Sequence, residues 1–318
     1  MDVVCLGELL VDLFPAEVGR PLAQVSSFRP VPGGAPANVA VAASRLGAKV
    51  GFIGKVGDDA FGRHLAQVLA AEGVDVRGVR FDAEARTTLA FIAQPDVNSY
   101  DILFYRNPGA DTRLRPEELD GDLLRATRAF HFGSLSLIEE PSRSATLEAV
   151  RVAREAGALV SFDVNYRPTL WSPDAARLQI EAALPLADVL KVNEADLGLL
   201  TGESDAARGG QRLLARGPAL VLVTLGPEGC VFCCAAGAEH VPAYAVETVD
   251  ATGCGDAFVA GLLTGLQRER DWPSALRTPR LHEIVRRACA AGALTATRQG
   301  AIPALPTAAE LEAFLAGR

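Results

Sequence analysis

The sequence predicts an α/β protein in which helices cover both faces of a mostly parallel sheet. Short apolar runs of strand length alternate with longer segments whose apolar residues recur at helical spacing. Strands that alternate with helices in this way usually pair in parallel, because each helix crosses over the sheet. The 318 residues are 49% hydrophobic, and neither a composition shift nor an internal repeat divides them. We therefore expect one domain spanning residues 1–318.

Each element of the main sheet and its helical layers is predicted from this pattern. The glycine pair Gly33–Gly34 interrupts the chain, for example, and the next segment has apolar residues at helical spacing. The expected strands are Asp2–Leu6, Lys49–Ile53, Ala129–Phe132, Leu159–Asp163, Val189–Val192, Ala219–Thr224, Cys230–Cys234 and His240–Val246. The expected helices are Pro36–Leu46, Ala60–Glu72, Ser142–Ala156, Arg177–Leu184, Ala206–Ala215, Asp256–Gln267, Leu281–Ala296 and Thr307–Ala316.

Two segments, Leu13–Pro32 and Thr87–Arg106, interrupt the alternation. Both are partly polar and resemble strands, and the second contains a strand pair, Thr87–Ala93 with Ile102–Arg106. We expect them to form a small accessory sheet. The segment Asp271–Arg280 is rich in Pro, Ala and Arg and predicts a surface loop.

Composition excludes several functional classes. The net charge is −8 and basic residues never run beyond a pair, which argues against nucleic acid or an anionic membrane as the main partner. No basic segment opens the chain, and no stretch reaches the ~18 uncharged apolar residues of a membrane span. The six irregularly spaced cysteines favour free thiols and a cytoplasmic location.

The segment Val249–Phe258 carries the strongest chemical signal. Gly253 and Gly255 flank Cys254, and Asp256 follows at the start of an apolar helix. Backbone amides at a helix start, together with the helix dipole, bind anions. A carboxylate beside such a site is electrostatically unfavourable, so its presence indicates a functional role. We therefore expect Asp256 to act as a base beside a phosphate.

Two motifs near the N-terminus are candidates for binding a hydroxyl-rich ligand. The segment Gly33–Asn38 combines two glycines, which allow close approach to the backbone, with the donors and acceptor of Asn38. An ordinary turn at a helix start would have the same pattern. Asp12 is expected at a strand end with its carboxylate pointing outward, where solvent is the alternative partner.

The segment Asp163–Arg167 ends another strand, at the sheet edge where open α/β proteins bind ligands. Strand alternation predicts that Asp163, Asn165 and Arg167 lie on one side. Arg167 would then reach a phosphoryl group or a carboxylate. A plain surface loop is the alternative.

Two further strand ends are candidates for nucleotide binding. Asn193 and Asp196 share a face if a helix begins there, and the acid would act on Mg²⁺ through water. A capping Asn followed by acids explains the same pattern. The segment Thr224–Gly229 would hold a phosphate tail or form a hairpin turn.

The sequence gives little support for a structural zinc site or for other common nucleotide-binding motifs. Cys230, Cys233, Cys234 and His240 lack a second ligand pair, so we do not expect structural zinc. The roles of these cysteines and of Cys254 stay open. The P-loop, the dinucleotide fingerprint and the protein-kinase signatures are absent from the sequence.

Taken together, the motifs resemble the ribokinase-like (pfkB) carbohydrate kinases. The segments Gly33–Asn38 and Gly51–Gly62 resemble the first family signature, and Asp250–Asp256 with Ala257–Leu262 resembles the second. The match is collinear from Val4 to about Pro303. It implies a three-layer α/β/α sandwich with a small β-sheet lid, formed by segments of about 13–32 and 87–106.

Within the family, the chain is most similar to fructokinases. Three strings carry this similarity: Gly7–Asp12, Phe104–Asp111 and His131–Ile138. The string Asp163–Trp171 would also suit a 2-keto-3-deoxygluconate kinase, and a ribokinase is a further alternative. A non-catalytic kinase-like binding protein is a third reading. It is disfavoured because the candidate base Asp256 and the glycines of the loop Gly253–Gly255, called the anion loop below, are intact.

The resemblance assigns roles to individual residues. It implies ATP and Mg²⁺ as ligands, with K⁺ as a further candidate. An exposed small sheet can pair with a second copy, so we also expect a homodimer formed through the lid. The sugar-binding residues would be Asp12, Gly33, Gly34, Asn38, Phe104, Arg106, Asn165 and Asp256, with Arg167 at the transferring phosphoryl group. The nucleotide-binding residues would be Asn193, Asp196, Thr224, Gly226, Gly229, Thr252, Gly253 and Gly255. Asp196 would act on Mg²⁺ through water, and Asp250, Thr252 and the carbonyls of Thr295–Gly300 would hold K⁺.

The implied mechanism has Asp256 deprotonate the sugar's primary hydroxyl, at C6 of fructose. The amides of Gly253, Cys254 and Gly255 would form an anion hole for the γ-phosphoryl group. Two positions depart from the family pattern. Cys254 stands where alanine is common, and Asp196 stands where glutamate is more frequent.

Overall fold

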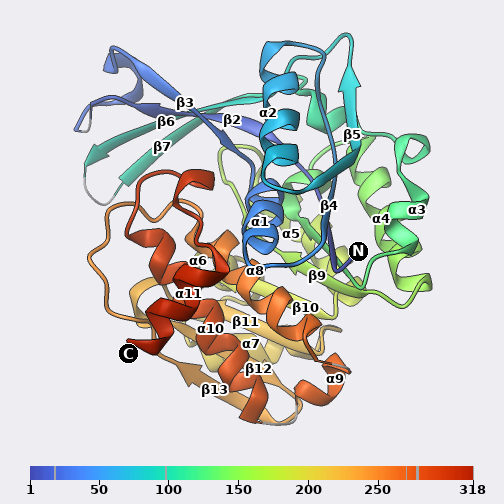
Figure 1. Ribbon diagram of the computed structural model, residues 1–318, viewed down its shortest axis with the longest axis vertical. Helices are drawn as coiled ribbons and strands as arrows, with labels where there is room; N and C mark the ends of the chain where they lie inside the picture. The colour runs from blue at the N-terminus through green and yellow to red at the C-terminus, as the bar shows by residue number, and fades with distance from the viewer. Residues whose placement is uncertain (18, 97–98, 270, 277–278, 318) are drawn as a thin grey trace.

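A nine-stranded sheet forms the centre of the computed structural model, which describes residues 1–17, 19–96, 99–269, 271–276 and 279–317. The strand order is β13-β12-β11-β10-β9-β8-β1-β4-β5 (Figure 1). Every pair from β11 to β5 is parallel, and β12 and β13 add an antiparallel edge. The strands are β1 Val3–Leu6, β4 Val50–Gly57, β5 Asp75–Asp82, β8 Ala129–Gly133, β9 Leu159–Asp163, β10 Val189–Asn193, β11 Leu220–Thr224, β12 Cys230–Cys234 and β13 Gly237–Val241.

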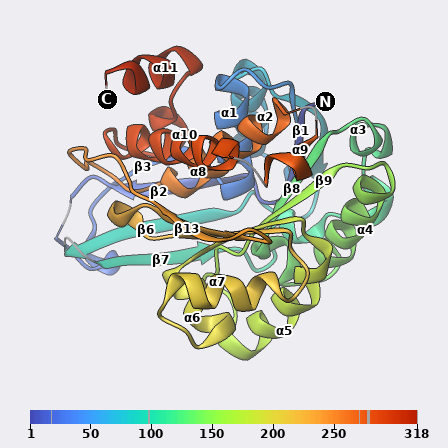
Figure 2. The same ribbon diagram turned by 90° about the horizontal axis from the view of Figure 1, so that it is seen from below.

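Helices cover both faces of this sheet, as Figure 2 shows edge-on. Alternate strand residues enter two separate cores: Val3 and Cys5 pack on one side, Val4 and Leu6 on the other. The three-layer prediction is confirmed. On the first face lie α1 Ala35–Arg45, α2 Ala60–Ala71, α8 Cys254–Gln267, α10 Pro279–Ala296 and α11 Ala308–Ala316. On the second lie α3 Gly121–Arg125, α4 Ser142–Glu155, α5 Pro173–Ala183, α6 Glu194–Thr201 and α7 Ala206–Leu214.

A separate four-stranded sheet projects from the upper left of the body in Figure 1. Its order is β3-β2-β6-β7, with β2 and β6 parallel and the outer pairs antiparallel. The register aligns Asp12, Ala90 and Phe104 in one row, so these residues share a face. Leu103 and Tyr105 point to the opposite face and are exposed. The strands are β2 Leu10–Pro15, β3 Phe28–Gly33, β6 Leu89–Asp96 and β7 Ser99–Tyr105.

Several predicted boundaries were wrong. The accessory sheet begins at Leu10 rather than Leu13, and residues 18 and 97–98 of its two segments lie outside the described residues. The last strand ends at Val241, because Pro242 has no amide hydrogen for the ladder. Part of the predicted loop Asp271–Arg280 is helical: α9 covers Trp272–Ala275, and α10 begins at Pro279. Residues 277–278 lie outside the description.

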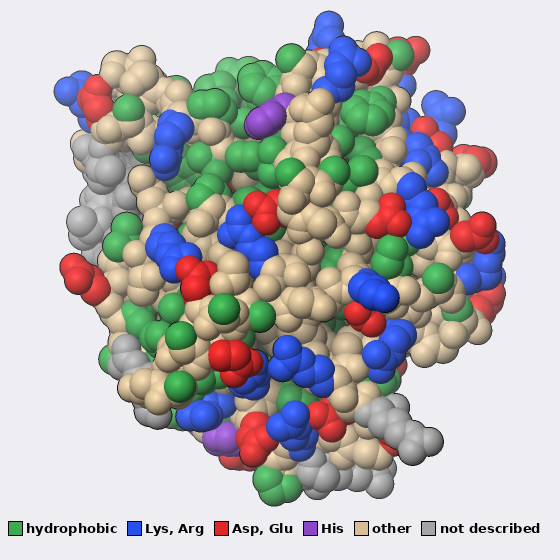
Figure 3. All heavy atoms as spheres, in the orientation of Figure 1, with side chains coloured by type: hydrophobic (Ala, Val, Ile, Leu, Met, Phe, Trp, Pro, Cys, Tyr) green, Lys and Arg blue, Asp and Glu red, His purple; other side chains and the backbone are tan. Residues whose placement is uncertain are grey.

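The elements β5, α3 and α9 were missed from the sequence, and the helix α6, which starts after Asn193, was only one of the alternatives considered there. The strand β5 is an edge strand carrying Asp75, Arg77 and Arg80, and this charge hides its apolar alternation. The helix α3 has only five residues. Among the described residues, no helix is long and apolar enough to cross a membrane. Acidic and basic side chains intermingle on the face in Figure 3.

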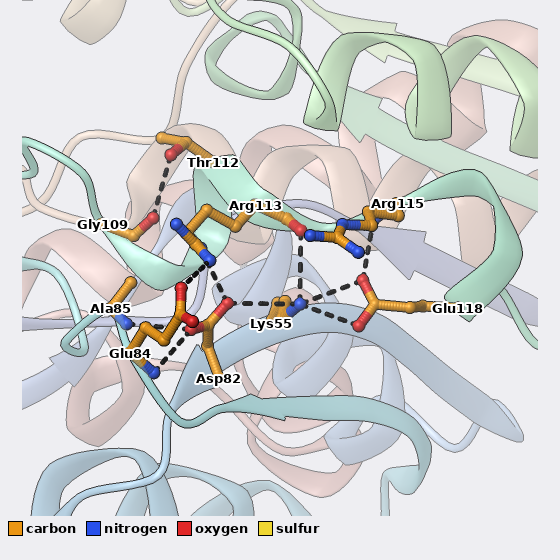
Figure 4. Close-up of polar contacts among 9 residues, drawn as sticks. All are labelled: Lys55, Asp82, Glu84, Ala85, Gly109, Thr112, Arg113, Arg115 and Glu118. Atoms are coloured by element: carbon orange, nitrogen blue, oxygen red, sulfur yellow. Dashed lines mark hydrogen bonds and ion pairs between the residues drawn. The ribbon is translucent and has the colours of Figure 1, made fainter.

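A buried polar cluster ties β4 and β5 to the chain that leaves the small sheet (Figure 4). Asp82 Oδ2 lies 2.9 Å from Arg113 Nε and 3.3 Å from Lys55 Nζ, while Oδ1 accepts the amides of Glu84 and Ala85. Lys55 Nζ also donates to Glu118 Oε1 at 2.7 Å. Burial would raise the pKa of Asp82, but these amides and cations hold it well below its usual range.

Asp82→Asn should destabilise the fold at pH 7 by about 3 kcal/mol, because the buried Lys55 and the half-exposed Arg113 lose a charged partner. A depressed pKa means that the carboxylate stabilises the fold above the unfolded-state pKa of about 3.9 and that this contribution fades below it. The wild type should therefore lose more stability than the variant between pH 7 and pH 3. Urea unfolding followed by circular dichroism at both pH values measures this, and equal losses would refute the assignment.

Candidate active site

The predicted anion loop lies at the start of α8. Gly253 caps the helix with a left-handed backbone, φ +82°, and a Cβ built on it would lie 3.2 Å from Ala301 Cα. Only glycine meets both requirements easily. Asp250 secures the loop: its Oδ1 accepts the amide and hydroxyl of Thr252, and its Oδ2 accepts the amide of Gly300 at 2.9 Å. The loop thus presents the first amides of a buried helix.

Cys254 is half-buried at the first position of this helix. Its Sγ lies 3.9 Å from the carbonyl oxygen of Asp250, so the side chain turns back toward its own loop. Burial and the neighbouring Asp250 raise the pKa of the thiol to about 12. The cysteine therefore stays neutral at physiological pH and adds no charge to the anion loop.

Asp256 is buried, with 8% of its surface exposed, where α8 packs beside α1. Asn38 Nδ2 donates to Asp256 Oδ2 at 2.8 Å. Burial raises the pKa of Asp256 to about 6, although Asn38, Lys191 and Arg167 oppose the rise. A carboxylate with a near-neutral pKa and fixed orientation is suited to general-base catalysis.

Lys191 is a neighbour of Asp256 that sequence reasoning missed. The register pairs Lys191 of β10 directly with Asp163 of β9, and Nζ lies 3.1 and 3.2 Å from the two carboxylate oxygens. Nζ would also lie 3.3 Å from a Cβ on Gly255. Burial would lower the pKa of Lys191, but Asp163, Asp196 and Asp256 raise it above its usual value. A buried cation therefore lies against the anion loop.

Asp12 interacts electrostatically with Asp256 and Arg167. Asp12 was predicted at a strand end, but it lies inside β2. Its Oδ2 occupies the space beside Gly33, since a Cβ added to Gly33 would lie only 2.0 Å from this oxygen. Burial raises the pKa of Asp12 to about 7, with further contributions from Asp256 and Glu8, while Arg167 opposes the rise. The small sheet thus brings a second carboxyl group within electrostatic range of Asp256.

The expected alternation of Asp163, Asn165 and Arg167 was wrong. Asn165 has a left-handed backbone, φ +41°, so β9 ends at Asp163 and the chain turns. Arg167 Nη1 donates to the carbonyls of Asn165 and Tyr166, at 3.4 and 3.2 Å. Arg167 still lowers the pKa values of Asp12, Asp163 and Asp256, which places its charge among them.

Arg106 and Phe104 lie at the small sheet rather than at the anion loop. Arg106 is buried, and its Nε and Nη2 each lie 2.7 Å from Asp111 Oδ2. Its Nη2 also donates to the Leu135 carbonyl at 3.0 Å. Phe104 is half-buried on the face that carries Asp12. The guanidinium is therefore already paired with an acid that sequence reasoning did not link to it.

The remaining candidates cap and connect elements at one sheet edge. Asn193 and Asp196 form a capping box at the start of α6, and Asp196 Oδ1 also accepts the Tyr166 amide at 3.0 Å. The segment Gly226–Glu228 is the turn between antiparallel β11 and β12. Gly226 is exposed, and Gly229 has φ +104°. Asp163, Asn193 and Thr224 end three parallel strands, which brings them to the same edge.

The β12 cysteines lie elsewhere and are split between two faces. Cys233 Sγ lies 3.7 Å from the Ala207 carbonyl of α7, whereas Cys234 Sγ lies 3.3 Å from the Leu276 carbonyl. His240 is exposed and contacts the Glu228 carbonyl. Within the part of the chain that the structure describes, no three His, Cys, Asp or Glu side chains gather as a metal site would require.

Comparison with known proteins agrees with this geometry. The family model for pfkB family carbohydrate kinases matches residues 1–308. The chain is 46% identical to a probable fructokinase-2 of Arabidopsis thaliana over 315 residues, covering 98% of this chain and 95% of the relative. It is 45% identical to fructokinase-2 of Solanum lycopersicum, over 99% and 96% of the two chains.

Solved structures give the same picture. A Vibrio cholerae O395 fructokinase double mutant with fructose, ADP and potassium ion is 36% identical, with a TM-score of 0.88 over 99% of this chain and 98% of that one. Salmonella enterica aminoimidazole riboside kinase is 37% identical, with a TM-score of 0.85 over all of both chains. An E. coli putative ribokinase II with ATP and Mg²⁺ is 30% identical, with a TM-score of 0.89 over 100% and 99%.

Proposed function

This chain belongs to the pfkB family of carbohydrate kinases, and we propose that the sugar it phosphorylates is fructose. The family assignment makes it an ATP-dependent sugar kinase. The fructokinases at 45 and 46% identity over nearly the whole chain are the observation that carries the choice of fructose. The string Phe104–Asp111, which resembles the sugar-contacting segment of fructokinases, supports the same choice.

Asp256 acts as the general base in this proposal. Fructose lies between the anion loop and the face of the small sheet that carries Asp12 and Phe104, with Gly33, Gly34, Asn38, Arg106 and Asn165 as further contacts. Asp256 removes the proton from the C6 hydroxyl, whose oxygen then attacks the γ-phosphorus of ATP as ADP leaves. The amides of Gly253, Cys254 and Gly255 stabilise charge on the transferring group, and so do Arg167 and Lys191.

The small sheet serves as a lid in this proposal. Closing it over the sugar would exclude water, which otherwise competes with the hydroxyl for the γ-phosphoryl group. The nucleotide lies along the edge where β10 and β11 end, with Asn193, Thr224, Gly226, Gly229 and Thr252 beside it.

The residues present fit the two cations that relatives bind. Carboxylate oxygen suits Mg²⁺. Asp196 holds its carboxylate fixed by two amides with lone pairs left over, which fits contact through water. Mg²⁺ would neutralise charge on the ATP phosphates. Asp250 joins the Thr252 turn to the segment before Gly300, and this oxygen-rich junction fits K⁺, which would add positive charge behind the anion loop.

A substrate panel tests the choice of sugar. With ATP and Mg²⁺, fructose should give the highest kcat/KM among fructose, ribose, 2-keto-3-deoxygluconate, adenosine and aminoimidazole riboside. A missing hydroxyl contact in a site built for it commonly costs a large factor in kcat/KM. The product should be the 6-phosphate, identified by ¹³C NMR. Turnover of only ribose, the keto-acid sugar or a riboside would contradict fructose and leave the kinase assignment intact.

We also propose a cytoplasmic homodimer formed through the lid. Leu103 is 48% and Tyr105 63% exposed on its outer face, where the Tyr105 ring packs 5.1 Å from Phe91. An exposed apolar sheet face favours association with a second copy. Sedimentation velocity should show a dimer for the wild type and a monomer for Tyr105→Asp. A wild type that remains monomeric at micromolar concentration would refute this interface.

A further inference from the structure

The helix α1 begins without a capping side chain of its own. Its N-cap residue is Gly34, and Pro36 in the first turn has no amide hydrogen. The amide of Ala35 donates instead to Glu8 Oε1 at 3.0 Å. Glu8 lies in the turn between β1 and β2, where the chain passes from the main sheet into the small sheet. A residue at the lid crossing therefore caps a helix of the main body.

This turn also packs tightly on the start of α1. A Cβ built on Gly34, whose φ is +103°, would lie 2.3 Å from the Glu8 carbonyl oxygen. A Cβ on Gly7 would lie 2.5 Å from Pro36 Cγ. Neither contact leaves room for adjustment. The β1–β2 turn and the first turn of α1 are thus packed directly against each other.

The same helix carries the hydrogen-bond donor to the base. Asn38 follows Ala35 by one turn, and its own amide donates to the Gly34 carbonyl at 2.9 Å. Its side chain then donates to Asp256 Oδ2 at 2.8 Å. A short chain of contacts leads from Glu8 through the helix start to Asp256. The groups that face Asp256 from other elements are Asp163, Lys191, Arg167 and Asp12.

Glu8 is an unfavourable residue for a cap that serves stability alone. Its side chain is buried, and Oε2 has no hydrogen-bond partner among the described residues. A buried polar atom without a partner destabilises a fold, and a smaller capping side chain would avoid it. Arg106 follows β7, where the chain leaves the small sheet, and its charge acts on the same carboxyl group. These features favour a role beyond stability.

We propose that Glu8 is a positioning residue, which holds the start of α1 so that Asn38 keeps its hydrogen bond to Asp256. The proposal rests on the proposed role of Asp256 as the base. Glu8 acts through Asn38 and touches neither substrate nor the reacting atoms. Its removal should therefore change the protonation of Asp256 and not only the stability of the fold.

Carboxyl ¹³C NMR of the unliganded full chain tests this, with the Asp256 signal assigned by its absence in Asp256→Asn. Glu8→Leu should raise the pKa of Asp256 by roughly 0.5–1 unit, the size of one hydrogen bond to a carboxylate. It should also lower kcat by about 10- to 100-fold, as small misplacements do. Glu8→Gln keeps an acceptor for the Ala35 amide, so its Asp256 pKa and its kcat should both stay close to the wild-type values. Glu8→Leu/Asn38→Ala should match the pKa of Asn38→Ala alone.

A Glu8→Leu protein that unfolds at lower urea but keeps the wild-type pKa of Asp256 would overturn the proposal. A double variant whose pKa shift exceeds that of Asn38→Ala would overturn it as well. If Glu8→Leu does not fold, Glu8→Asp is used in its place, because it withdraws the carboxylate from the Ala35 amide by one methylene. The same outcomes then support or overturn the proposal. The NMR titration needs no substrate, so failure to phosphorylate fructose would not be mistaken for failure of this proposal.

Discussion

Asp256→Asn is expected to lower kcat for fructose by at least ~10²–10⁴-fold while nucleotide binding is retained, because asparagine cannot accept the hydroxyl proton. The substitution keeps the size of the side chain and an oxygen that accepts from Asn38 Nδ2. The local packing of α1 on α8 should therefore survive. A coupled assay of ADP release gives kcat, and isothermal titration with ADP gives the nucleotide affinity.

Asp122→Asn is a suitable control for this experiment. Asp122 lies in the first turn of α3, as Asp256 does in α8, but its side chain is 88% exposed. Its substitution should leave kcat unchanged within experimental error. Near-normal turnover of Asp256→Asn would remove Asp256 as the base. Loss of ADP binding along with turnover would instead indicate a damaged anion loop.

Lys191→Met is expected to lower kcat by about 10²–10³-fold, the usual cost of losing one group that stabilises charge in the transition state. It should also destabilise the fold by about 3–5 kcal/mol, because Asp163 would be left buried without its cation. Lys191 also lowers the pKa of Asp256, so its loss should move the acid limb of activity to higher pH. Initial rates across pH and urea unfolding measure these effects.

The double variant Lys191→Met/Asp163→Asn separates catalysis from stability. It removes both charges of the buried pair, so much of the lost stability should return. Turnover should stay low, because the cation beside Gly255 is still missing. Recovery of kcat together with stability would show that Lys191 is only a structural partner of Asp163.

The strand ends and the anion loop could be predicted from the sequence because their signals are local. Gly253 and Asp256 lie within four residues of each other at a helix start, and helical spacing marks the helix that follows. The parallel sheet follows from the alternation of elements. The small sheet could be located, although its first strand was placed too late, because only the short turn Gly7–Leu9 separates Leu10 from an apolar run that already reads as a strand.

The partners of buried charges could not be predicted, since they depend on register. Lys191 is one polar residue in an apolar strand, and its pairing with Asp163 appears only once β9 and β10 are aligned. Arg106 was expected at the sugar, which stays a prediction; its ion pair with Asp111 could not be foreseen, because it depends on how the chain turns after β7. Glu8 caps a helix that begins 27 residues later, and no local pattern indicates this.

The dependence of kcat/KM for fructose on pH tests the central claim, that Asp256 is the base in fructose phosphorylation. Burial raises the pKa of Asp256 to about 6, and a base works only when it is deprotonated. Activity should therefore fall below an acid limb near pH 6, and the residual rate of Asp256→Asn should lack that limb. A wild-type profile that stays flat from about pH 5 to pH 8, or a limb that persists in Asp256→Asn, would contradict the account.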